Sequence, residues 1–489
     1  MAIIFNIVGI ALVLAICFLL SYDRKAIKWG AIVRMLVAEL VIAFIIVKVP
    51  VGAMAVQKLS DGITNVINCG NEGLSFVFGD LMGGTATIYE GHYQVVTETK
   101  KVNGVVEVVK LDEENPTMQL KDENDNFVIE KYDTKGKKEV VENIVVRDDK
   151  GELKLEYVTI TDEKGDATTP VATYNSWVFI TSSLGNIIFV SALVSSLYYL
   201  GAIGFVVKYL GKAVGLITQT TEVETFVAVA NMFLGHTDSP ILVAKYLPRL
   251  TDSEIFVILV SGMGSMSASI LGGYSALGIP MKNLLIASAL VPIGSIMVSK
   301  VMCPQTEEVQ SVGEVKMDNH GNNTNVIDAL SDGCNTGIQM VISIGASIVG
   351  FMGVMAIFDM ILGVVNLSFA QIFGYVFAPF GFLMGFGADA AIIEGTLLGQ
   401  KLILNEFIAF GDLVDNMAKL SETEQLIATI SLCGFANISS MGMCIGGIGV
   451  LCPEKRGTIS RLIVKATLAG VFVSINSAFF VSMMSRLPF

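Results

Sequence analysis

Two acidic residues, Asp238 and Glu406, stand in short polar stretches that have apolar sequence on both sides. A charged side chain inside a membrane is costly, so an intramembrane carboxylate is by default a candidate for function. The alternative is a pair of solvated loops, and the apolar flanks argue against it. Amide and hydroxyl groups accompany the two carboxylates and supply hydrogen-bond donors and acceptors; they belong to Asn231, Thr237, Asn405, Asn437 and Ser440.

This set of side chains suits a neutral solute that is rich in hydroxyl groups, because directional hydrogen bonds recognise such a molecule. An anion would need a positive charge, which only Lys401 offers here, and snorkelling of its ammonium to the membrane interface explains that residue equally well. Three aromatic side chains could stack on a flat ring, although plain packing is their commoner role. They are Phe233, Phe407 and Phe435.

The composition places these stretches in a membrane. Of the 489 residues, 53% are hydrophobic and only 16% are charged, against roughly 25% charged residues in soluble domains. The formal net charge of −13 does not indicate a basic partner, because the acidic excess gathers mainly in residues 83–176. The seven cysteines and three histidines are scattered, so we expect no metal centre built from them and no organic cofactor. The expected partner is a lipid bilayer, with no nucleic acid.

The two polar stretches each interrupt apolar sequence that is too short to span a bilayer. Residues 231–240 contain Gly235 and Pro240 and separate two short apolar arms, whereas a spanning helix needs about 20 apolar residues. This pattern predicts a re-entrant hairpin over about 220–247, which is tolerated at membrane depth only where it lines a cavity. Residues 395–410 repeat the pattern and predict a second hairpin.

A broken helix follows each predicted hairpin. The apolar segment 255–277 is interrupted at 262–269 by glycine and serine, and the segment 427–450 is interrupted at 434–442. Paired discontinuous segments at matching positions of an inverted repeat are a sequence pointer to a transporter site. We therefore predict an all-α polytopic membrane protein with two opposed hairpins, one in each inverted repeat.

Charge fixes the expected orientation of the spans. Arg24, Lys25 and Lys28 follow the first span, and because positive loops stay in the cytoplasm, the N-terminus is expected outside. Residues 83–176 contain clusters of β-forming residues separated by turn dipeptides such as Asn103-Gly104, which predicts a small β-rich insertion outside the membrane. It would capture a partner or solute, or be a decoration, and the second role is favoured.

These elements divide the chain into six parts. They are 1–82, two spans and an interfacial helix; 83–176, the extracytoplasmic β-rich insertion; 177–219, a span; 220–302, the first hairpin and broken helix; 303–389, a cytoplasmic loop, a span and an interfacial helix; and 390–489, the second hairpin and broken helix. Residues 220–302 and 390–489 are called the first and second repeat below.

Three motifs carry a resemblance to a known family. They are Asn231-Met232-Phe233-Leu234-Gly235-His236-Thr237-Asp238-Ser239-Pro240, Asn405-Glu406-Phe407-Ile408-Ala409-Phe410 and Cys433-Gly434-Phe435-Ala436-Asn437-Ile438-Ser439-Ser440. The chain resembles the concentrative nucleoside transporters over residues 1–80 and 177–489. The resemblance implies eight spanning helices with interfacial helices, a homotrimer, and import of nucleosides with sodium or, in some members, protons.

The resemblance also implies roles for individual residues. His236, Thr237 and Asp238 would face the nucleobase with Ile270 beside them; Glu406, Asn437 and Ser440 would hold the ribose hydroxyls; Phe435 would line the pocket; and sodium would bind the side chains of Asn231 and Ser265 with the carbonyls of Leu234 and Met266. Oxygen ligands suit such a hard cation.

Two positions depart from the family's usual pattern. His236 stands where glutamine is common, and Asp238 where glutamate is common. Both changes lie on the base side, so the nucleoside class is expected and the base preference is open, with a modified or purine nucleoside among the alternatives. A histidine also titrates near physiological pH when unperturbed, although a plain hydrogen-bonding role is favoured.

The sequence therefore predicts an ion-coupled nucleoside importer in a bacterial inner membrane, working by alternating access. One alternative is a carrier of another neutral, hydroxyl-rich solute. The other is an intramembrane enzyme that uses Asp238 and Glu406 as a carboxylate pair.

Overall fold

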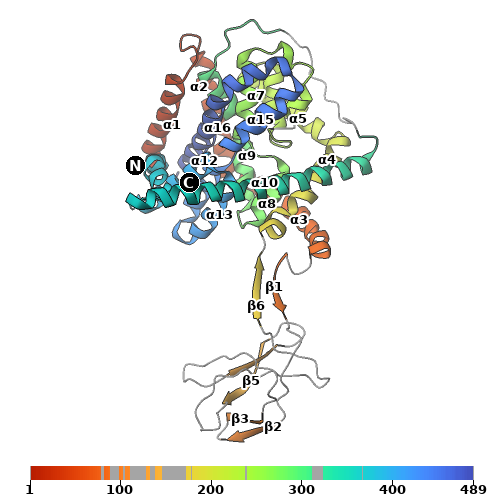
Figure 1. Ribbon diagram of the computed structural model, residues 1–489. Helices are drawn as coiled ribbons and strands as arrows, with labels where there is room; N and C mark the ends of the chain where they lie inside the picture. The colour runs from red at the N-terminus through yellow and green to blue at the C-terminus, as the bar shows by residue number, and fades with distance from the viewer. Residues whose placement is uncertain are drawn as a thin grey trace. The chain divides into compact units, whose positions relative to one another are not determined.

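The computed structural model divides into two compact units, one of Met1–Phe76 with Ser182–Phe489 and one of Val77–Thr181. We call them the helical unit and the strand unit and describe each by itself (Figure 1). Thr237 and Asp238 lie outside the described residues. The described residues are 2–78, 82–88, 98–102, 105–110, 128–132, 138–145, 172–177, 179–236, 239–310, 323–365 and 367–487.

The helical unit begins with three helices near the positions expected from the sequence. They are α1 (Ala2–Leu19), α2 (Trp29–Val47) and α3 (Pro50–Phe78). Helix α3 buries Ile67, Gly70 and Leu74 on one side and exposes most of its other side chains. A side chain at Gly70 would collide with Phe189, so this glycine allows α3 to pack closely against the next helix.

The single span expected within residues 177–219 is divided into two helices. After a π-helical turn, η2 (Ile180–Leu184), the chain forms α4 (Asn186–Tyr199) and α5 (Ala202–Thr218), which meet at an angle of 75°. Gly201 makes the bend with a φ of 78°, a backbone conformation that only glycine adopts without strain. Helix α5 buries one stripe of residues and exposes Phe205 and Tyr209, as suits a helix that lies along a lipid surface.

The first repeat contains short helices joined by breaks. Its elements are α6 (Glu222–Ala230), η3 (Ser239–Val243), η4 (Leu247–Arg249), α7 (Asp252–Gly264), α8 (Ala268–Ala276) and α9 (Met281–Met302). Capping boxes start α6 at Thr221 and α7 at Thr251, because the threonine hydroxyl and a glutamate three residues later satisfy free backbone N–H groups. The break between α7 and α8 falls inside the interruption that the sequence predicts.

A long helix and the second repeat complete the unit. The elements are α10 (Val326–Leu362), η5 (Gly363–Val365), α11 (Phe369–Leu383), α12 (Ala388–Ile403), α13 (Glu406–Asn416), η6 (Met417–Lys419), α14 (Glu422–Leu432), α15 (Ile438–Leu451), η7 (Pro453–Lys455) and α16 (Arg456–Ser485). Helices α11 and α12 meet at 118°. Gly395 packs against the backbone of α11 at Gly374 and Ala378, where a side chain would collide.

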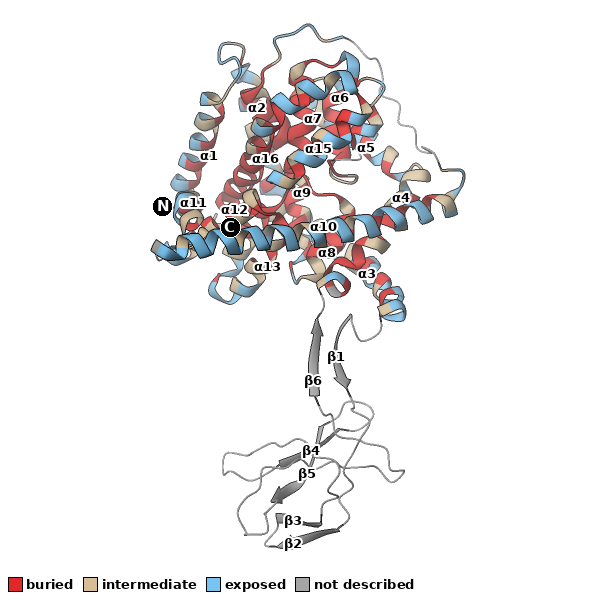
Figure 2. Cartoon of the chain, viewed as in Figure 1, coloured by how far each residue is buried: buried red, intermediate tan, exposed pale blue. Residues whose placement is uncertain are grey.

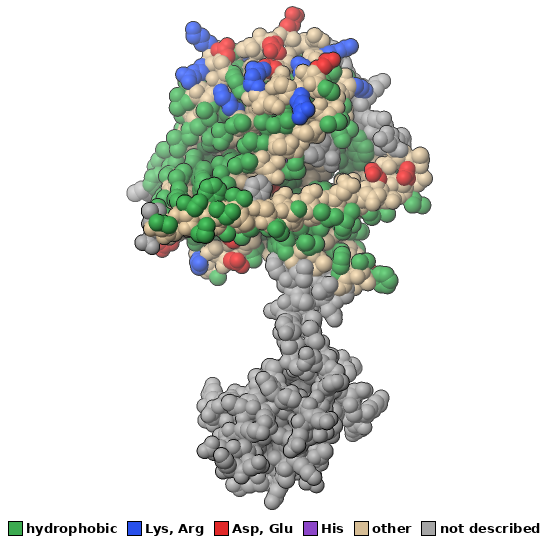
Figure 3. Space-filling view, in the orientation of Figure 1, with side chains coloured by type: hydrophobic (Ala, Val, Ile, Leu, Met, Phe, Trp, Pro, Cys, Tyr) green, Lys and Arg blue, Asp and Glu red, His purple; other side chains and the backbone are tan. Residues whose placement is uncertain are grey.

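The core of the helical unit lies around α7, α9 and α16, which are buried over most of their length (Figure 2). Within the described residues, six helices are long and apolar enough to cross a membrane, or up to eight if each of two bent pairs is one span. Hydrophobic side chains cover a broad band of the surface, and Lys and Arg side chains gather at one end (Figure 3). This distribution is typical of a protein embedded in a bilayer.

Among its described residues, the strand unit contains three antiparallel pairings and one parallel pairing. Strand β1 (Met82–Ile88) pairs with β6 (Ala172–Trp177). A four-stranded sheet has the order β2-β3-β5-β4, in which β3 and β5 are parallel. Its strands are β2 (Glu98–Val102), β3 (Val105–Lys110), β4 (Val128–Tyr132) and β5 (Lys138–Val145).

Candidate functional site

The breaks of the two discontinuous helices meet at the centre of the helical unit. The backbone N–H of Phe435 donates to the carbonyl oxygen of Ser265 across 3.3 Å. Next to it, Gly434 has a φ of 110°, and a Cβ at this position would lie 2.8 Å from the carbonyl oxygens of Met263 and Gly264. The close approach therefore requires glycine, and it brings together residues that are far apart in the sequence.

A network of hydrogen bonds holds the carboxylate of Glu406, which is only 3% exposed. The Tyr274 hydroxyl donates to Oε1 at 2.9 Å, and Nδ2 of Asn437 donates to Oε2 at 3.0 Å. The other end of the Asn437 amide accepts from the backbone N–H of Ser440 at 2.8 Å, which caps α15. The two partners fix the orientation of the carboxylate without neutralising it.

A cavity of about 370 Å³ lies beside this network. Six of the eight residues predicted to contact substrate line it, so the structure brings them together; Thr237 and Asp238 lie outside the described residues. The six are His236, Ile270, Glu406, Phe435, Asn437 and Ser440. This volume is within the range of about 300–1,000 Å³ that small-molecule sites occupy.

His236 lines this cavity and carries a buried polar atom without a partner among the described residues. Its ring is buried and lies 4.8 Å from the ring centroid of Phe435, and its Nε2 has no hydrogen-bond partner among the residues the structure describes. The hydroxyl oxygens of Ser267 and Ser440, which also line the cavity, are likewise unpartnered there. Buried polar groups are normally hydrogen-bonded, so these three atoms suit a polar ligand or water.

The opposite wall of the cavity comes from α10, which sequence analysis did not connect with the site. Polar side chains on this wall follow one face of the helix at helical spacing; they belong to Thr336, Gln339, Ser343 and Ser347. The signal was present in the sequence, because polar residues at intervals of three or four in a long apolar helix mark a face turned away from lipid.

Two of the residues predicted to bind sodium are buried beside the break after α7. Asn231 and Ser265 are buried, and Nδ2 of Asn231 donates to Ser261 Oγ at 2.9 Å while its Oδ1 accepts from Ser239 at 2.6 Å. The carbonyl oxygen of Phe233 accepts from the N–H of Ala268 at 3.1 Å, so the polar segment after α6 is tied to the break after α7. Neutral oxygens in this arrangement fit a hard monovalent cation better than a transition metal.

The observed position of Lys401 contradicts the prediction that its ammonium extends to the membrane interface. The side chain is fully buried, and its Nζ donates to the carbonyl oxygens of Ser431 and Cys433 at 2.9 Å each and to Ser474 Oγ at 2.7 Å. Helix α14 ends at Leu432, and the last carbonyls of a helix lack partners within it. The ammonium therefore satisfies the end of α14 inside the protein.

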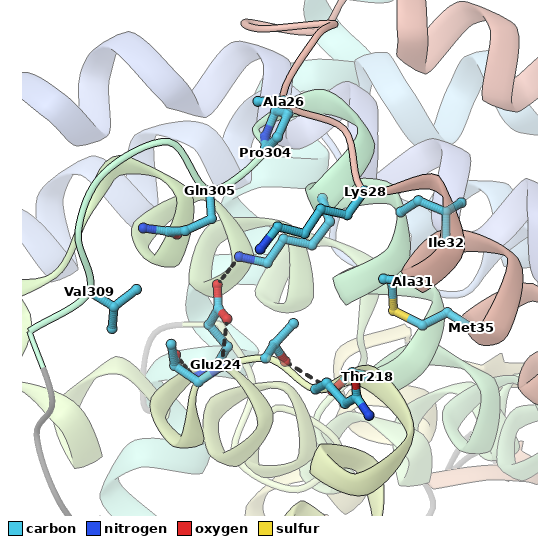
Figure 4. A pocket seen from close by; sticks show the side chains of 14 residues that line it. Ala26, Lys28, Ala31, Ile32, Met35, Thr218, Glu224, Pro304, Gln305 and Val309 are labelled. Carbon is cyan, nitrogen blue, oxygen red and sulfur yellow. Dashed lines mark hydrogen bonds and ion pairs between the residues drawn. The ribbon is translucent and has the colours of Figure 1, made fainter.

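A second cavity, of about 330 Å³, lies beside the start of α6 (Figure 4). Lys300 of α9 forms an ion pair with Glu224 there, and the same glutamate accepts from the backbone N–H of Thr221 at 3.0 Å. Glu224 therefore joins the beginning of α6 to the end of α9.

Comparison with known proteins agrees with this geometry. Models described as the N-terminus and C-terminus of the Na+ dependent nucleoside transporter match residues 8–81 and 283–482, and one described as nucleoside recognition matches residues 180–281. The chain is 29% identical over 487 residues to the nucleoside permease NupC of Helicobacter pylori, covering 97% of this chain and 96% of that protein. It is 31% identical over 325 residues to the sodium/nucleoside cotransporter 1 of Mus musculus, covering 62% of this chain and 50% of that protein.

Solved structures of CNTnw are similar over the whole chain. The inward-facing, substrate-bound state has a TM-score of 0.77 and 28% identity, covering 99% of this chain and 100% of that chain. A CNTnw variant in an outward-facing state has a TM-score of 0.78 and 27% identity, covering 100% of this chain and 99% of that chain. These relatives are transporters, which decides against an intramembrane enzyme. The chain is thus a multi-pass membrane protein, and it belongs to the family of Na+-dependent, concentrative nucleoside transporters.

Proposed function

We propose that this protein imports nucleosides by a secondary active mechanism coupled to sodium. The observation that carries the proposal is the buried carboxylate of Glu406, oriented by Tyr274 and Asn437 at the edge of the 370 Å³ cavity. A carboxylate that keeps acceptor capacity binds vicinal hydroxyl groups strongly, because hydrogen bonds to a charged acceptor are about twice as strong as neutral ones. Glu406, Asn437 and Ser440 would hold the ribose.

The base would lie on the side of the first repeat. His236 offers an unpartnered Nε2 among the described residues, and Ile270 and Phe435 supply apolar surface for a flat ring. Thr237 and Asp238 follow His236 directly in the chain and would add a hydroxyl and a carboxylate. Because His236 and Asp238 are the positions that differ from the usual family pattern, they would determine the base preference of this protein.

Sodium would be the coupling ion, and the sodium dependence named in the family models supports this. Asn231 and Ser265 would contribute side-chain oxygens, and Leu234 and Met266 backbone carbonyls. Hydrogen bonds already tie the polar segment after α6 to the break after α7, so an ion bound between them would stabilise the base side of the pocket. This arrangement would couple ion binding to nucleoside binding.

Transport would proceed by alternating access. The segments 220–247 and 395–410 would be opposed re-entrant hairpins, and they would move with the two broken helices against α10. The inward-facing and outward-facing structures of CNTnw support two such states for the family fold. The N-terminus and the β-rich insertion would lie outside the cytoplasm, and the assembly would be a homotrimer in a bacterial inner membrane.

The proposal is tested by uptake into proteoliposomes. Radiolabelled uridine and inosine are supplied with an inward sodium gradient, with equal sodium on both sides, and with a proton gradient in place of sodium. We expect accumulation above equilibrium only with the sodium gradient. Accumulation driven by the proton gradient alone would show that protons, and not sodium ions, are the coupling ion. The nucleoside assignment would be overturned if neither uridine nor inosine accumulates while another neutral polyol does.

A further inference from the structure

Several residues of the two broken helices match at a constant separation. Both broken helices begin with a capping box and share a serine and a glycine at equivalent places. The equivalent residues are Thr251 and Ser421, Glu254 and Glu424, Ser261 and Ser431, and Gly264 and Gly434, each pair 170 positions apart. The same separation therefore identifies equivalent residues in the two hairpin segments.

At this separation Asn231 of the first repeat corresponds to Lys401 of the second. The structure gives the two side chains parallel contacts. Nδ2 of Asn231 donates to the hydroxyl of Ser261 at 2.9 Å, and Nζ of Lys401 donates to the backbone carbonyl of Ser431, the equivalent serine, also at 2.9 Å. One repeat thus has a neutral amide, proposed above as a sodium ligand, where the other has a fixed positive charge.

The surroundings of Lys401 resemble a cation site. Three oxygens accept from the ammonium: two backbone carbonyls at the end of α14 and the hydroxyl of Ser474. The end of a helix carries partial negative charge, which favours a cation. A carboxylate lies close by, because Ser431, whose carbonyl accepts from Lys401, donates its hydroxyl to Glu394. Carbonyl and hydroxyl oxygens near carboxylates are the environment in which hard cations bind.

The equivalent glutamates Glu224 and Glu394 have different partners in the two repeats. Glu224 in the first turn of α6 is paired with Lys300 of α9. Glu394, which is 170 positions after Glu224, instead accepts from Ser431 Oγ at 2.5 Å, beside Lys401. The lysine of the first repeat therefore lies away from the break between α7 and α8, whereas Lys401 contacts the end of α14 at the break of the second repeat.

We infer that the ammonium of Lys401 is an internal cation that occupies, in the second repeat, the place that the coupling ion takes in the first. The ribose half of the pocket then needs no external ion, because its cation, the ammonium of Lys401, is part of the chain. Only the base half depends on an external ion. This inference rests on the proposed sodium site, and it makes Lys401 a positioning residue for Glu406 and the end of α14.

Chemical rescue tests the inference. Purified wild-type protein, Lys401→Ala and Lys401→Met are compared by thermal unfolding, with and without ammonium or methylammonium chloride, at constant ionic strength. Alanine leaves space for a small free cation, whereas methionine fills the same volume without charge. We expect Lys401→Ala to have a lower Tm that rises on adding ammonium, while the Tm of wild type and of Lys401→Met does not respond.

Nucleoside binding supplies the second measurement. Both variants are expected to bind uridine at least tenfold more weakly than wild type, and ammonium is expected to restore part of the affinity in Lys401→Ala alone. The inference would be overturned if Lys401→Met has the same Tm and the same uridine affinity as wild type. It would also be overturned if Lys401→Ala folds but neither ammonium nor methylammonium raises its Tm. If Lys401→Ala does not fold even with ammonium, Lys401→Met decides by itself. The thermal measurement needs no nucleoside, so it remains informative if wild type fails to bind uridine, which would count against the proposed function instead.

Discussion

The hydroxyl of Tyr274 donates to Glu406 across 2.9 Å and joins the last turn of α8 in the first repeat to the start of α13 in the second. The Tyr274 ring is buried 4.6 Å from the ring centroids of both Phe407 and Phe410. The tyrosine is therefore locked by packing, and it holds the carboxylate in place. Preorganisation of this kind increases affinity, because a ligand does not have to order the group that binds it.

Replacing Tyr274 with phenylalanine should weaken nucleoside binding while leaving the packing intact. The change removes one hydrogen bond to a charged acceptor, worth about 1.5–3 kcal/mol, so we expect a roughly tenfold or greater rise in the uridine Kd. Isothermal titration with purified protein measures it. The matched control is Tyr199→Phe, which removes a hydrogen bond to the carbonyl oxygen of Thr324 outside the cavity and should leave the Kd unchanged. Equal effects of the two substitutions would contradict the assignment.

The substitution His236→Gln together with Asp238→Glu should change the base preference and not the sugar requirement. Both residues belong to the proposed base side, and the Nε2 of His236 is free of partners among the described residues. We expect the order of inhibition by uridine, cytidine, inosine and adenosine in competition uptake to change. The loss of affinity for 2′-deoxynucleosides should stay the same, because Glu406 and Asn437 are untouched.

The control for this pair is the same histidine substitution at His320, which is distant in the chain from either polar segment. It should leave both the base order and the sugar requirement as in wild type. An unchanged base order in the double variant would show that His236 and Asp238 do not select the base.

Gln339 on α10 should affect substrate affinity, although it belongs to neither repeat. Gln339 lines the cavity with the other polar residues of that wall. Replacing it with leucine removes a possible hydrogen bond of about 1 kcal/mol, so the KM for uptake should rise about fivefold with the sodium dependence unaltered. Gln57→Leu in α3, where the glutamine donates to Asp61, serves as the control and should not change KM. A KM equal to that of wild type in Gln339→Leu would mean that the ligand does not reach α10.

Gly434→Ala should destabilise the protein at the crossing of the two broken helices. The residue has a φ of 110°, and a methyl group there would lie 2.8 Å from two carbonyl oxygens. Strain of this kind amounts to about 1–3 kcal/mol, so we expect the Tm in detergent to fall by several degrees. Gly442→Ala is the control, because a Cβ at Gly442 has no atom within 4 Å and alanine favours a helix. If Gly434→Ala has a Tm as high as that of Gly442→Ala, the close approach of Gly434 to the carbonyl oxygens of the first broken helix would be contradicted.

The sequence by itself determined the local breaks and the polar chemistry. Two apolar segments interrupted by Gly, Ser and Asn predict helices that cannot run through, and the structure ends α7 at Gly264 and α14 at Leu432. Carboxylates and amides in apolar surroundings predict where a polar solute would bind, and six of the eight predicted substrate residues line one cavity. These features depend on neighbouring residues in the chain, so composition and spacing reveal them.

Only the tertiary structure decided which distant residues meet. The bend at Gly201 divides the single span expected within residues 177–219 into two helices, because an apolar segment alone does not show whether its helix turns. Two further features were not predicted from the sequence: the cavity wall formed by α10, and the full burial of the Lys401 ammonium. A lysine near a hydrophobic segment has the same local pattern whether it reaches water or carbonyl oxygens. The oxygens that accept from Lys401 come from residues 30 to 73 positions away, and long-range packing alone brings them to it.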